Sequence, residues 1–253
     1  CTCFLSHQKV TPNVAGTLNM HRQLGTEIFR WGHGVDQVTL FRENLQGRGA
    51  WVIPLGGTCW LGAVGFVNAG LELAAQVADG RIERPDRIYI ACGTTGSAAG
   101  LALGIAAAGL DSTVHAVQVA DNPFASERKM RKLMAKTQLI LNRADSSFMA
   151  NGFEDKVVWR SEFLAGGYAR VDDATTKAVR IATDELGLSL ETTYTGKAMA
   201  AMLHDLETKR CDGDSCLFWN TYNARALPVS AARPADLGNI PAEFERYYDA
   251  DLR

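Results

Sequence analysis

The chain has 253 residues, a length that suits one large α/β domain or two smaller ones. Hydrophobic residues make up 47% and charged residues 21%, so the chain can bury a core and intrinsic disorder of its body is excluded. The formal net charge is −2, and we find no run near the roughly 18 apolar residues of a membrane span, so neither a nucleic acid nor a membrane is expected as a partner.

Strands and helices alternate at the start of the chain. Residues 3–5 read as a strand, 15–24 as a helix that ends at Gly25, and 27–31 as a second strand. This alternation predicts a parallel sheet with flanking helices. The first residue is Cys1 and no signal-peptide pattern is present, so we interpret the sequence as a truncated or processed chain whose start lies upstream.

A domain boundary is predicted near residue 50, because residues 46–49 are polar and contain glycines. Residues 1–50 would be the remainder of a small α/β domain, and 51–253 a large α/β domain.

A long helix is predicted over 61–77, and its apolar residues lie nearly all round it, which indicates burial on several sides. Gly62, Gly65 and Ala69 form a face of small residues. Because glycine costs about 1 kcal/mol relative to alanine inside a helix, we expect close packing at this face.

The next segment has the pattern of a βαβ unit. A buried strand at 87–92 leads through a loop at 93–97 to a helix at 98–108, and a second strand follows at 114–119. Further along we expect a helix that starts at 121–123, helices over 172–186 and 196–206, a buried strand over 216–220, and a tail from Pro228 that wraps the surface.

The six cysteines form no C-x-x-C pair, so the sequence predicts no zinc or other metal site. Cys211 and Cys216 flank a loop and could be close in space, but a chain of this size does not need a disulfide. Reduced thiols and a cytoplasmic location are therefore expected.

The strongest local signal for function is the loop Gly93-Thr94-Thr95-Gly96-Ser97 between a strand and a helix. Its backbone N–H groups and the helix N-terminus favour a bound anion, and its hydroxyls add donors. A plain βα turn is the alternative. The spacing of a P-loop, of a dinucleotide-binding fingerprint and of a hydrolase nucleophile elbow is absent, which leaves a small phosphorylated cofactor such as pyridoxal phosphate.

Four spaced blocks carry a family resemblance. They are Ile53 to Thr58 with the helix start at 61–66, the loop region Ala91 to Gly100, the block Tyr194-Thr195-Gly196-Lys197-Ala198-Met199, and Leu217 to Thr221. In this order they resemble the fold type II pyridoxal-phosphate enzymes, and within them the branch of 1-aminocyclopropane-1-carboxylate deaminase and D-cysteine desulfhydrase. A weaker match upstream joins Gly16 to Leu24-Gly25, with Thr17 where the family has asparagine.

The resemblance implies an α/β fold with open parallel sheets and flanking helices, like the tryptophan synthase β-subunit, whose N-terminal part would be missing here. It implies pyridoxal 5′-phosphate as the cofactor, a small amino acid as the substrate and a homodimer. Its phosphate loop falls on Gly93, Thr94, Thr95, Gly96 and Ser97, and the partner of the pyridine nitrogen falls on Thr221.

The resemblance also places residues around the substrate. Gly57 and Thr195 would contact it, while Tyr168 and Tyr194 fall on the two active-site tyrosines of the branch and would handle protons. For each tyrosine the alternative is a buried hydroxyl with a structural partner. Lys197 is interpreted as a structural lysine, because the family's Schiff-base lysine lies in a segment upstream of Cys1.

Three functions stay open at this point. Thr195 matches the desulfhydrases, whereas the deaminases have glutamate there, so D-cysteine desulfhydrase, which gives pyruvate, sulfide and ammonia, ranks first. Cyclopropane deaminase, which gives 2-oxobutanoate and ammonia, ranks second. A non-catalytic member without the Schiff-base lysine is the third, and Tyr222-Asn223 in place of the family's Gly-Gly pair supports it.

Overall fold

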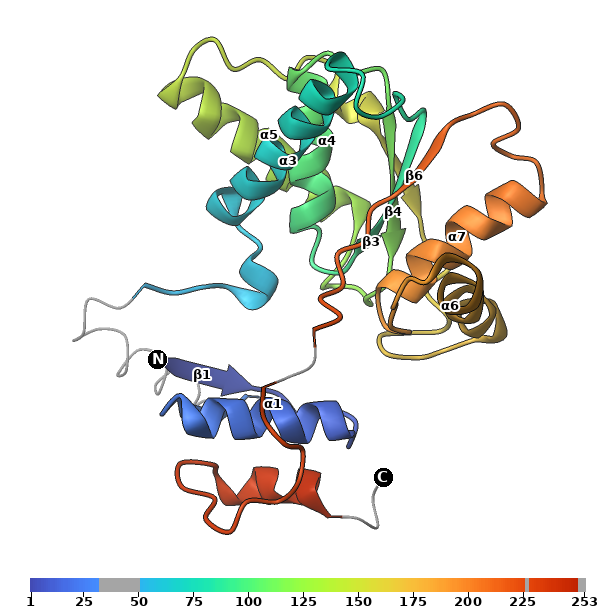
Figure 1. The fold of residues 1–253 in the computed structure, drawn as a ribbon. Coiled ribbons are helices and arrows are strands. Elements are labelled where there is room, and N and C mark those ends of the chain that lie inside the picture. Colours follow the sequence, from blue (N-terminus) through green and yellow to red (C-terminus); the bar gives the residue numbers. More distant parts are fainter. Residues whose placement is uncertain (32–50, 226–227, 250–253) are drawn as a thin grey trace. The chain divides into compact units, whose positions relative to one another are not determined.

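The computed structural model describes residues 1–31, 51–225 and 228–249 (Figure 1). The chain divides into two compact units, Cys1–Val52 with Arg225–Arg253, and Ile53–Ala224. The polar stretch 46–49, on which the predicted boundary rests, lies outside the described residues. The C-terminal residues, which we expected in the large domain, group with the N-terminal ones instead.

The smaller unit begins with a βαβ arrangement. Strand β1 (Thr2–Leu5) pairs in parallel with β2 (Glu27–Arg30), and helix α1 (Pro12–Gln23) connects them. The Thr11 hydroxyl starts α1 by accepting the N–H of Val14 at 3.3 Å. The predicted strands and helix of this segment are confirmed.

The C-terminal tail supplies half of the core of this unit. The short 3₁₀ helix η3 (Ala242–Tyr248) buries Phe244, Tyr247 and Tyr248 against residues of α1 and β2. The hydroxyl of Tyr248 also donates to the side-chain oxygen of Asn19 at 2.7 Å. The expectation of a surface tail was wrong. It was based on the prolines and mixed charges of the tail, but three aromatic residues of the tail are buried, and their burial stabilises the small unit.

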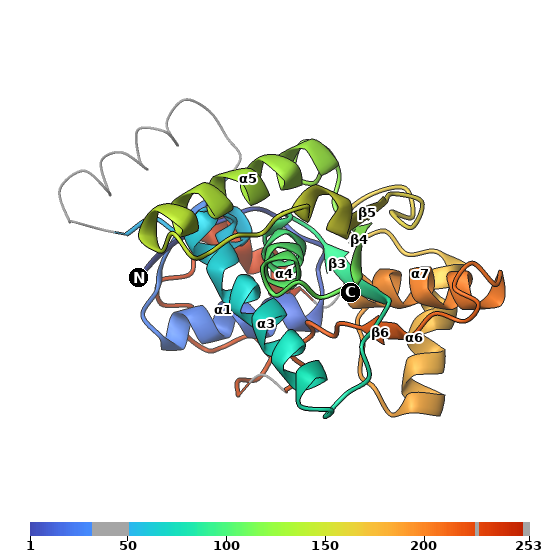
Figure 2. The ribbon, with the colours of Figure 1, turned by 90° about the horizontal axis from the view of Figure 1, so that it is seen from above.

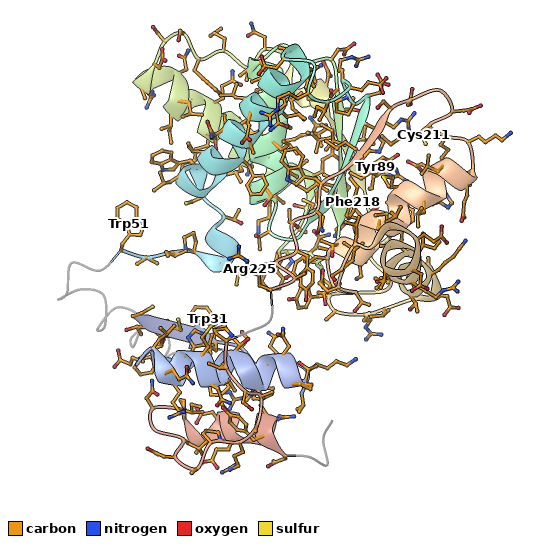
Figure 3. All side chains as sticks on the ribbon, in the orientation of Figure 1. Trp31, Trp51, Tyr89, Cys211, Phe218 and Arg225 are labelled. Carbon is orange, nitrogen blue, oxygen red and sulfur yellow. The ribbon has the colours of Figure 1, made fainter. Side chains whose placement is uncertain are left out.

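The larger unit is built on a parallel sheet with the strand order β5-β4-β3-β6. Its strands are β3 (Arg87–Cys92), β4 (Thr113–Gln118), β5 (Val157–Arg160) and β6 (Cys216–Phe218). Tyr89 of β3 and Phe218 of β6 are in register and lie on the side of the sheet that faces α7 (Figure 3). The predicted parallel α/β fold is confirmed.

Helices cover both faces of this sheet (Figures 1 and 2). Helix α4 (Gly96–Ala107) lies on one face, with α3 (Trp60–Ala78) and α5 (Glu127–Ala144) packed on it. Helix α7 (Thr195–Glu207) lies on the other face, with α6 (Asp173–Leu186) packed on it. This two-sided cover explains why β3 and β4 are buried along nearly their whole length.

Close packing joins α3 to α4. Of the predicted glycines, Gly62 is closely packed, but against η1 (Leu55–Gly57) rather than α4, since a Cβ atom there would lie 2.0 Å from the carbonyl oxygen of Gly57. A Cβ atom on Gly100 or Gly104 of α4 would lie 2.3 Å from the carbonyl oxygen of Ala63 or 2.1 Å from that of Val67. A Cβ atom on Gly65 would have nothing within 4 Å. The small-residue contact therefore lies one helix face away from Gly62, Gly65 and Ala69.

The expectation that α3 is buried on several sides was also wrong. Leu61 is 44% exposed and Leu71 38% exposed, and the helix buries only the face that meets α4. By length and composition alone, α3 is apolar enough to cross a membrane, but Asn68, Glu72 and Gln76 interrupt it. The helix that is buried nearly all round is α4, because it lies between the sheet and two other helices.

Helix caps in the second half of the unit were largely predictable. Asp172 accepts the N–H of Thr175 at 2.8 Å and starts α6, while Gly187 ends it with a φ of 64°. The helix expected from 121–123 begins later, at Glu127, where Ser126 caps it. Strand β5 (Val157–Arg160) was not predicted.

All six cysteines are free thiols. The Cys216 thiol donates to the backbone oxygen of Asp214 at 3.9 Å, and burial, together with the neighbouring Cys211, raises its pKa to about 12.

Candidate active site

The loop Gly93–Ser97 joins β3 to α4 at the carboxyl end of the sheet. Thr95 adopts a left-handed conformation with a φ of 82° and offers no side-chain cap to α4, whose first turn has no acidic residue. The first N–H groups of a helix lack partners inside it, and the helix dipole makes this end positive. A phosphate monoester therefore fits the start of α4.

A second turn lies against this loop. The 3₁₀ turn η1 (Leu55–Gly57) leads to Thr58, whose hydroxyl donates to the Thr94 hydroxyl at 2.5 Å. Gly56 has a φ of 65°, and a Cβ atom there would lie 2.3 Å from Oγ1 of Thr94. The neighbouring Gly57 has open space where a Cβ would be, so its backbone is accessible beside the loop.

Two tyrosines meet next to the loop. The hydroxyl oxygens of Tyr168 and Tyr194 are 2.9 Å apart, and their rings cross edge to face with centroids 5.9 Å apart. A Cβ atom on Gly93 would lie 3.1 Å from a ring carbon of Tyr194, so the ring lies close against the backbone of the loop and a larger residue there would push it aside. Tyr168 is 42% and Tyr194 37% exposed, which leaves the hydroxyl pair within reach of a ligand.

Tyr194 is held in its protonated form. Burial and the hydrogen bond to Tyr168 raise its pKa well above the usual value for a tyrosine. At neutral pH it can therefore donate a proton but does not lose it on its own.

Thr195 is buried, unlike the neighbouring Tyr194. Its side chain is 1% exposed, and its hydroxyl accepts the N–H of Glu191 at 3.1 Å. The Glu191 carboxylate accepts the N–H groups of Tyr194 and Thr195 at 2.8 and 2.7 Å, which caps α7. The observed contacts of Thr195 thus belong to the start of α7, and its role toward a substrate stays a prediction.

Thr221 is exposed on the irregular segment that follows β6. Because β6 runs parallel to β3, its carboxyl end lies at the same edge of the sheet as Gly93. The edge is shared, and a contact of Thr221 with a cofactor ring stays a prediction. Among the residues that the structure describes, no cluster of His, Cys, Asp or Glu is arranged to hold a metal ion.

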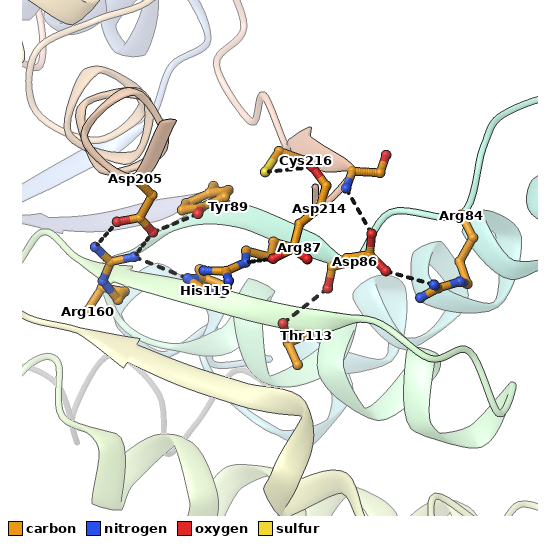
Figure 4. Close-up of polar contacts among 11 residues, drawn as sticks. Arg84, Asp86, Arg87, Tyr89, Thr113, His115, Arg160, Asp205, Asp214 and Cys216 are labelled. Atoms are coloured by element: carbon orange, nitrogen blue, oxygen red, sulfur yellow. Dashed lines mark hydrogen bonds and ion pairs between the residues drawn. The ribbon is translucent and has the colours of Figure 1, made fainter. Parts of the chain in front are cut away.

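A buried polar network fixes α7 on the sheet, and sequence reasoning missed it (Figure 4). Asp205 of α7 accepts the Tyr89 hydroxyl at 2.7 Å and two N–H groups of Arg160 at 2.5 and 2.9 Å. His115 lies beside Arg160 at 3.2 Å, and burial together with this guanidinium lowers its pKa to about 4. A signal for it in the sequence was Asp205, a charged residue among the buried positions of α7.

Comparison with known proteins agrees with this geometry. A family model described as pyridoxal-phosphate dependent enzyme matches residues 1–221. D-cysteine desulfhydrases of Salmonella paratyphi C and Salmonella choleraesuis are 33% identical over 192 residues, which are 76% of this chain and 56% of each of those proteins. The chain thus spans little more than half the length of these curated relatives.

Solved structures share the fold. An ACC deaminase homologue has a TM-score of 0.66 at 22% identity, and the match covers 85% of this chain and 63% of that one. An L-serine ammonia-lyase from Rhizomucor miehei has a TM-score of 0.52 at 15% identity, with 86% and 66% covered. Loop, tyrosine pair, family model and fold agree, and the chain belongs to the fold type II family of pyridoxal-phosphate dependent enzymes, in the branch of 1-aminocyclopropane-1-carboxylate deaminase and D-cysteine desulfhydrase.

Proposed function

We propose that this chain is the cofactor-binding part of a lyase or deaminase that uses pyridoxal phosphate to convert D-cysteine to pyruvate, sulfide and ammonia. The observation that carries the proposal is the hydroxyl pair of Tyr168 and Tyr194, placed beside the uncapped start of α4. The choice of D-cysteine is supported by the relatives of that name at 33% identity.

The start of α4 would hold the cofactor by its phosphate. The N–H groups of Gly96 and Ser97 are the first of α4 and have no partner inside the helix, and the hydroxyls of Thr94 and Ser97 lie in the same loop. Pyridoxal phosphate, when bound, supplies an electron-withdrawing ring for reactions at the α-carbon of an amino acid. The glycines at 56 and 93 keep side chains out of this space.

The tyrosine pair would handle the protons. One phenolic proton is used in the hydrogen bond between Tyr168 and Tyr194, so the other is free to point at a ligand. Because its pKa is raised, Tyr194 stays a proton donor across the neutral range. A thiol has a pKa near ~8.5, so the thiolate can depart as an anion, and the tyrosine hydroxyl would stabilise it by donating a hydrogen bond rather than by giving up its proton.

The preference for D-cysteine over the cyclopropane substrate also rests on Thr221. A hydroxyl at that place, unlike a carboxylate, does not favour a fully protonated pyridine ring, and eliminating a thiolate demands less electron withdrawal than opening a carbon ring. The carboxylate nearest to Thr195, that of Glu191, is occupied with the backbone N–H groups of α7.

The test is a paired assay on the protein purified as its gene encodes it. Pyruvate from D-cysteine and 2-oxobutanoate from 1-aminocyclopropane-1-carboxylate are measured side by side with added pyridoxal phosphate. We expect pyruvate release that Tyr194→Phe lowers and Tyr247→Phe, a matched change in the small unit, does not. Faster 2-oxobutanoate release would reverse the ranking, and cofactor binding without turnover of either substrate would establish a non-catalytic member. The cytoplasmic location and the homodimer stay predictions.

A further inference from the structure

Lys197 is a buried lysine that the proposed chemistry does not use. Its side chain is 0% exposed, and its ammonium donates to the carbonyl oxygens of Leu164 and Gly167 at 2.7 and 3.0 Å. Burial lowers its pKa, while the carboxylates of Asp172, Asp121 and Glu191 act in the opposite direction. Burying a charged lysine costs free energy unless its ammonium is hydrogen-bonded, so we asked what its two carbonyl partners stabilise.

Both carbonyls belong to one strained loop, residues 161–171. Ala165, Gly166, Gly167 and Ala169 all have positive φ angles, of 57°, 77°, 146° and 55°. Alanine rarely adopts this conformation, and such a backbone persists only where its surroundings hold it. Lys197 holds the loop through two carbonyls, and Asp121 holds it by accepting the N–H of Tyr168 at 2.8 Å.

The loop and the lysine connect the two tyrosines. Tyr168 directly follows Gly167, whose carbonyl oxygen Lys197 binds. Tyr194 caps the same helix on which Lys197 lies, less than one turn away. The lysine thus fastens the loop of one tyrosine to the helix of the other, and the 2.9 Å contact between the hydroxyls is the result.

We infer that Lys197 is a positioning residue, which acts through the loop 161–171 to hold Tyr168 against Tyr194. The inference rests on the proposed function of the tyrosine pair. It also excludes Lys197 as a nucleophile toward an aldehyde, because its amine is fully buried and two of its protons bind carbonyl oxygens. Asp121, in the segment that follows β4, has the matching role, because it accepts the N–H of Tyr168.

The first test reads the loop without any cofactor or substrate. Amide hydrogen exchange is followed by mass spectrometry in the protein and in its Lys197→Met and Lys197→Gln variants, with Lys177→Met as the control. Lys177 is an exposed lysine of α6 that pairs with Glu207 on α7 at 2.6 Å. In Lys197→Met we expect exchange in peptides covering 161–171 to rise roughly tenfold to hundredfold, while peptides of β3 stay as protected as before.

Lys197→Gln should restore part of the protection, because its amide keeps donors for the carbonyls, and Lys177→Met should leave the loop unchanged. Unchanged exchange of the loop in Lys197→Met would overturn the inference. A uniform loss of protection across the large unit in both Lys197 variants would also overturn it, because Lys197 would then stabilise the whole unit and not the loop in particular.

The second test measures whether the effects of changing Lys197 and Tyr168 on turnover depend on each other. In the active protein, Lys197→Met should lower kcat with KM within about twofold, and adding Lys197→Met to Tyr168→Phe should cost little more, because both changes remove the same contact. Additive losses would overturn the inference. If the protein turns over neither substrate, the exchange experiment still decides the role of Lys197, so the two proposals fail separately.

Discussion

Substituting Gly96 tests the anion site most directly. A Cβ atom there would lie 3.4 Å from the Thr58 hydroxyl and 3.8 Å from its Cα, which is ordinary contact, so the fold accepts an added methyl group. The two further methyl groups of Gly96→Val enter the space where a phosphate oxygen must approach the first N–H groups of α4. We therefore expect binding to suffer while folding does not.

The size of the effect follows from the bonds at stake. A hydrogen bond to a charged group contributes about 1.5–3 kcal/mol, and the helix dipole adds about 0.3–1 kcal/mol. Losing one or two such bonds weakens binding by about 2–6 kcal/mol, or roughly thirtyfold to twenty-thousandfold.

The assay is isothermal titration with pyridoxal phosphate and, separately, with inorganic phosphate, against the parent protein and Gly65→Ala. Gly65 is a helical glycine with nothing within 4 Å of a Cβ atom, so its variant controls for the change of residue type. Equal dissociation constants for folded Gly96→Val and the parent protein would place the phosphate site elsewhere.

Three further outcomes are expected. Tyr194→Phe should lower turnover of D-cysteine by about a hundredfold or more with unchanged cofactor affinity, and unchanged turnover would exclude the pair from proton transfer. Gly104→Ala should lower the free energy of unfolding in urea by about 1–3 kcal/mol, since its Cβ would lie 2.1 Å from a backbone oxygen; a neutral effect would refute the helix contact. Folding lowers the pKa of His115 to about 4, so between about pH 6.5 and 4 the unfolded chain binds a proton that the folded chain does not. The free energy of unfolding should therefore fall over this range by up to about 3 kcal/mol more than it does in His115→Gln.

The sequence predicted those features of the fold that depend on interactions between residues close together in the chain. Asp172 and Gly187 mark the ends of α6 because a carboxylate cap and a left-handed glycine each act within one turn of the helix. The loop at 93–97 was recognisable for the same reason, since its glycines stand between a buried strand and a helix. In these places the chain needs no distant partner to adopt its conformation.

Features that depend on distant partners were missed or misplaced. Strand β5, which was not predicted, ends in Arg160, and this charged residue is buried only because Asp205, 45 positions later, pairs with it in the interior. The composition of α3 suggested burial all round, but its exposure depends on which elements pack on it. Likewise, the close glycine contact with α4 lies on a face of α3 that could not be identified from the sequence, because it depends on how the two helices cross.

Helix α7 shows how such distant contacts bear on the site. Its first residues carry Tyr194 and Lys197, and its far end carries Asp205, whose carboxylate is anchored to β3 and β5 through Tyr89 and Arg160. A helix held at both ends by buried charges has little freedom to slide along the sheet, because any shift would leave a charge without its partner in a medium of low dielectric constant. The helix that begins beside Tyr194 is therefore held in place by buried polar groups at both of its ends, which supports the tyrosine pair from the interior.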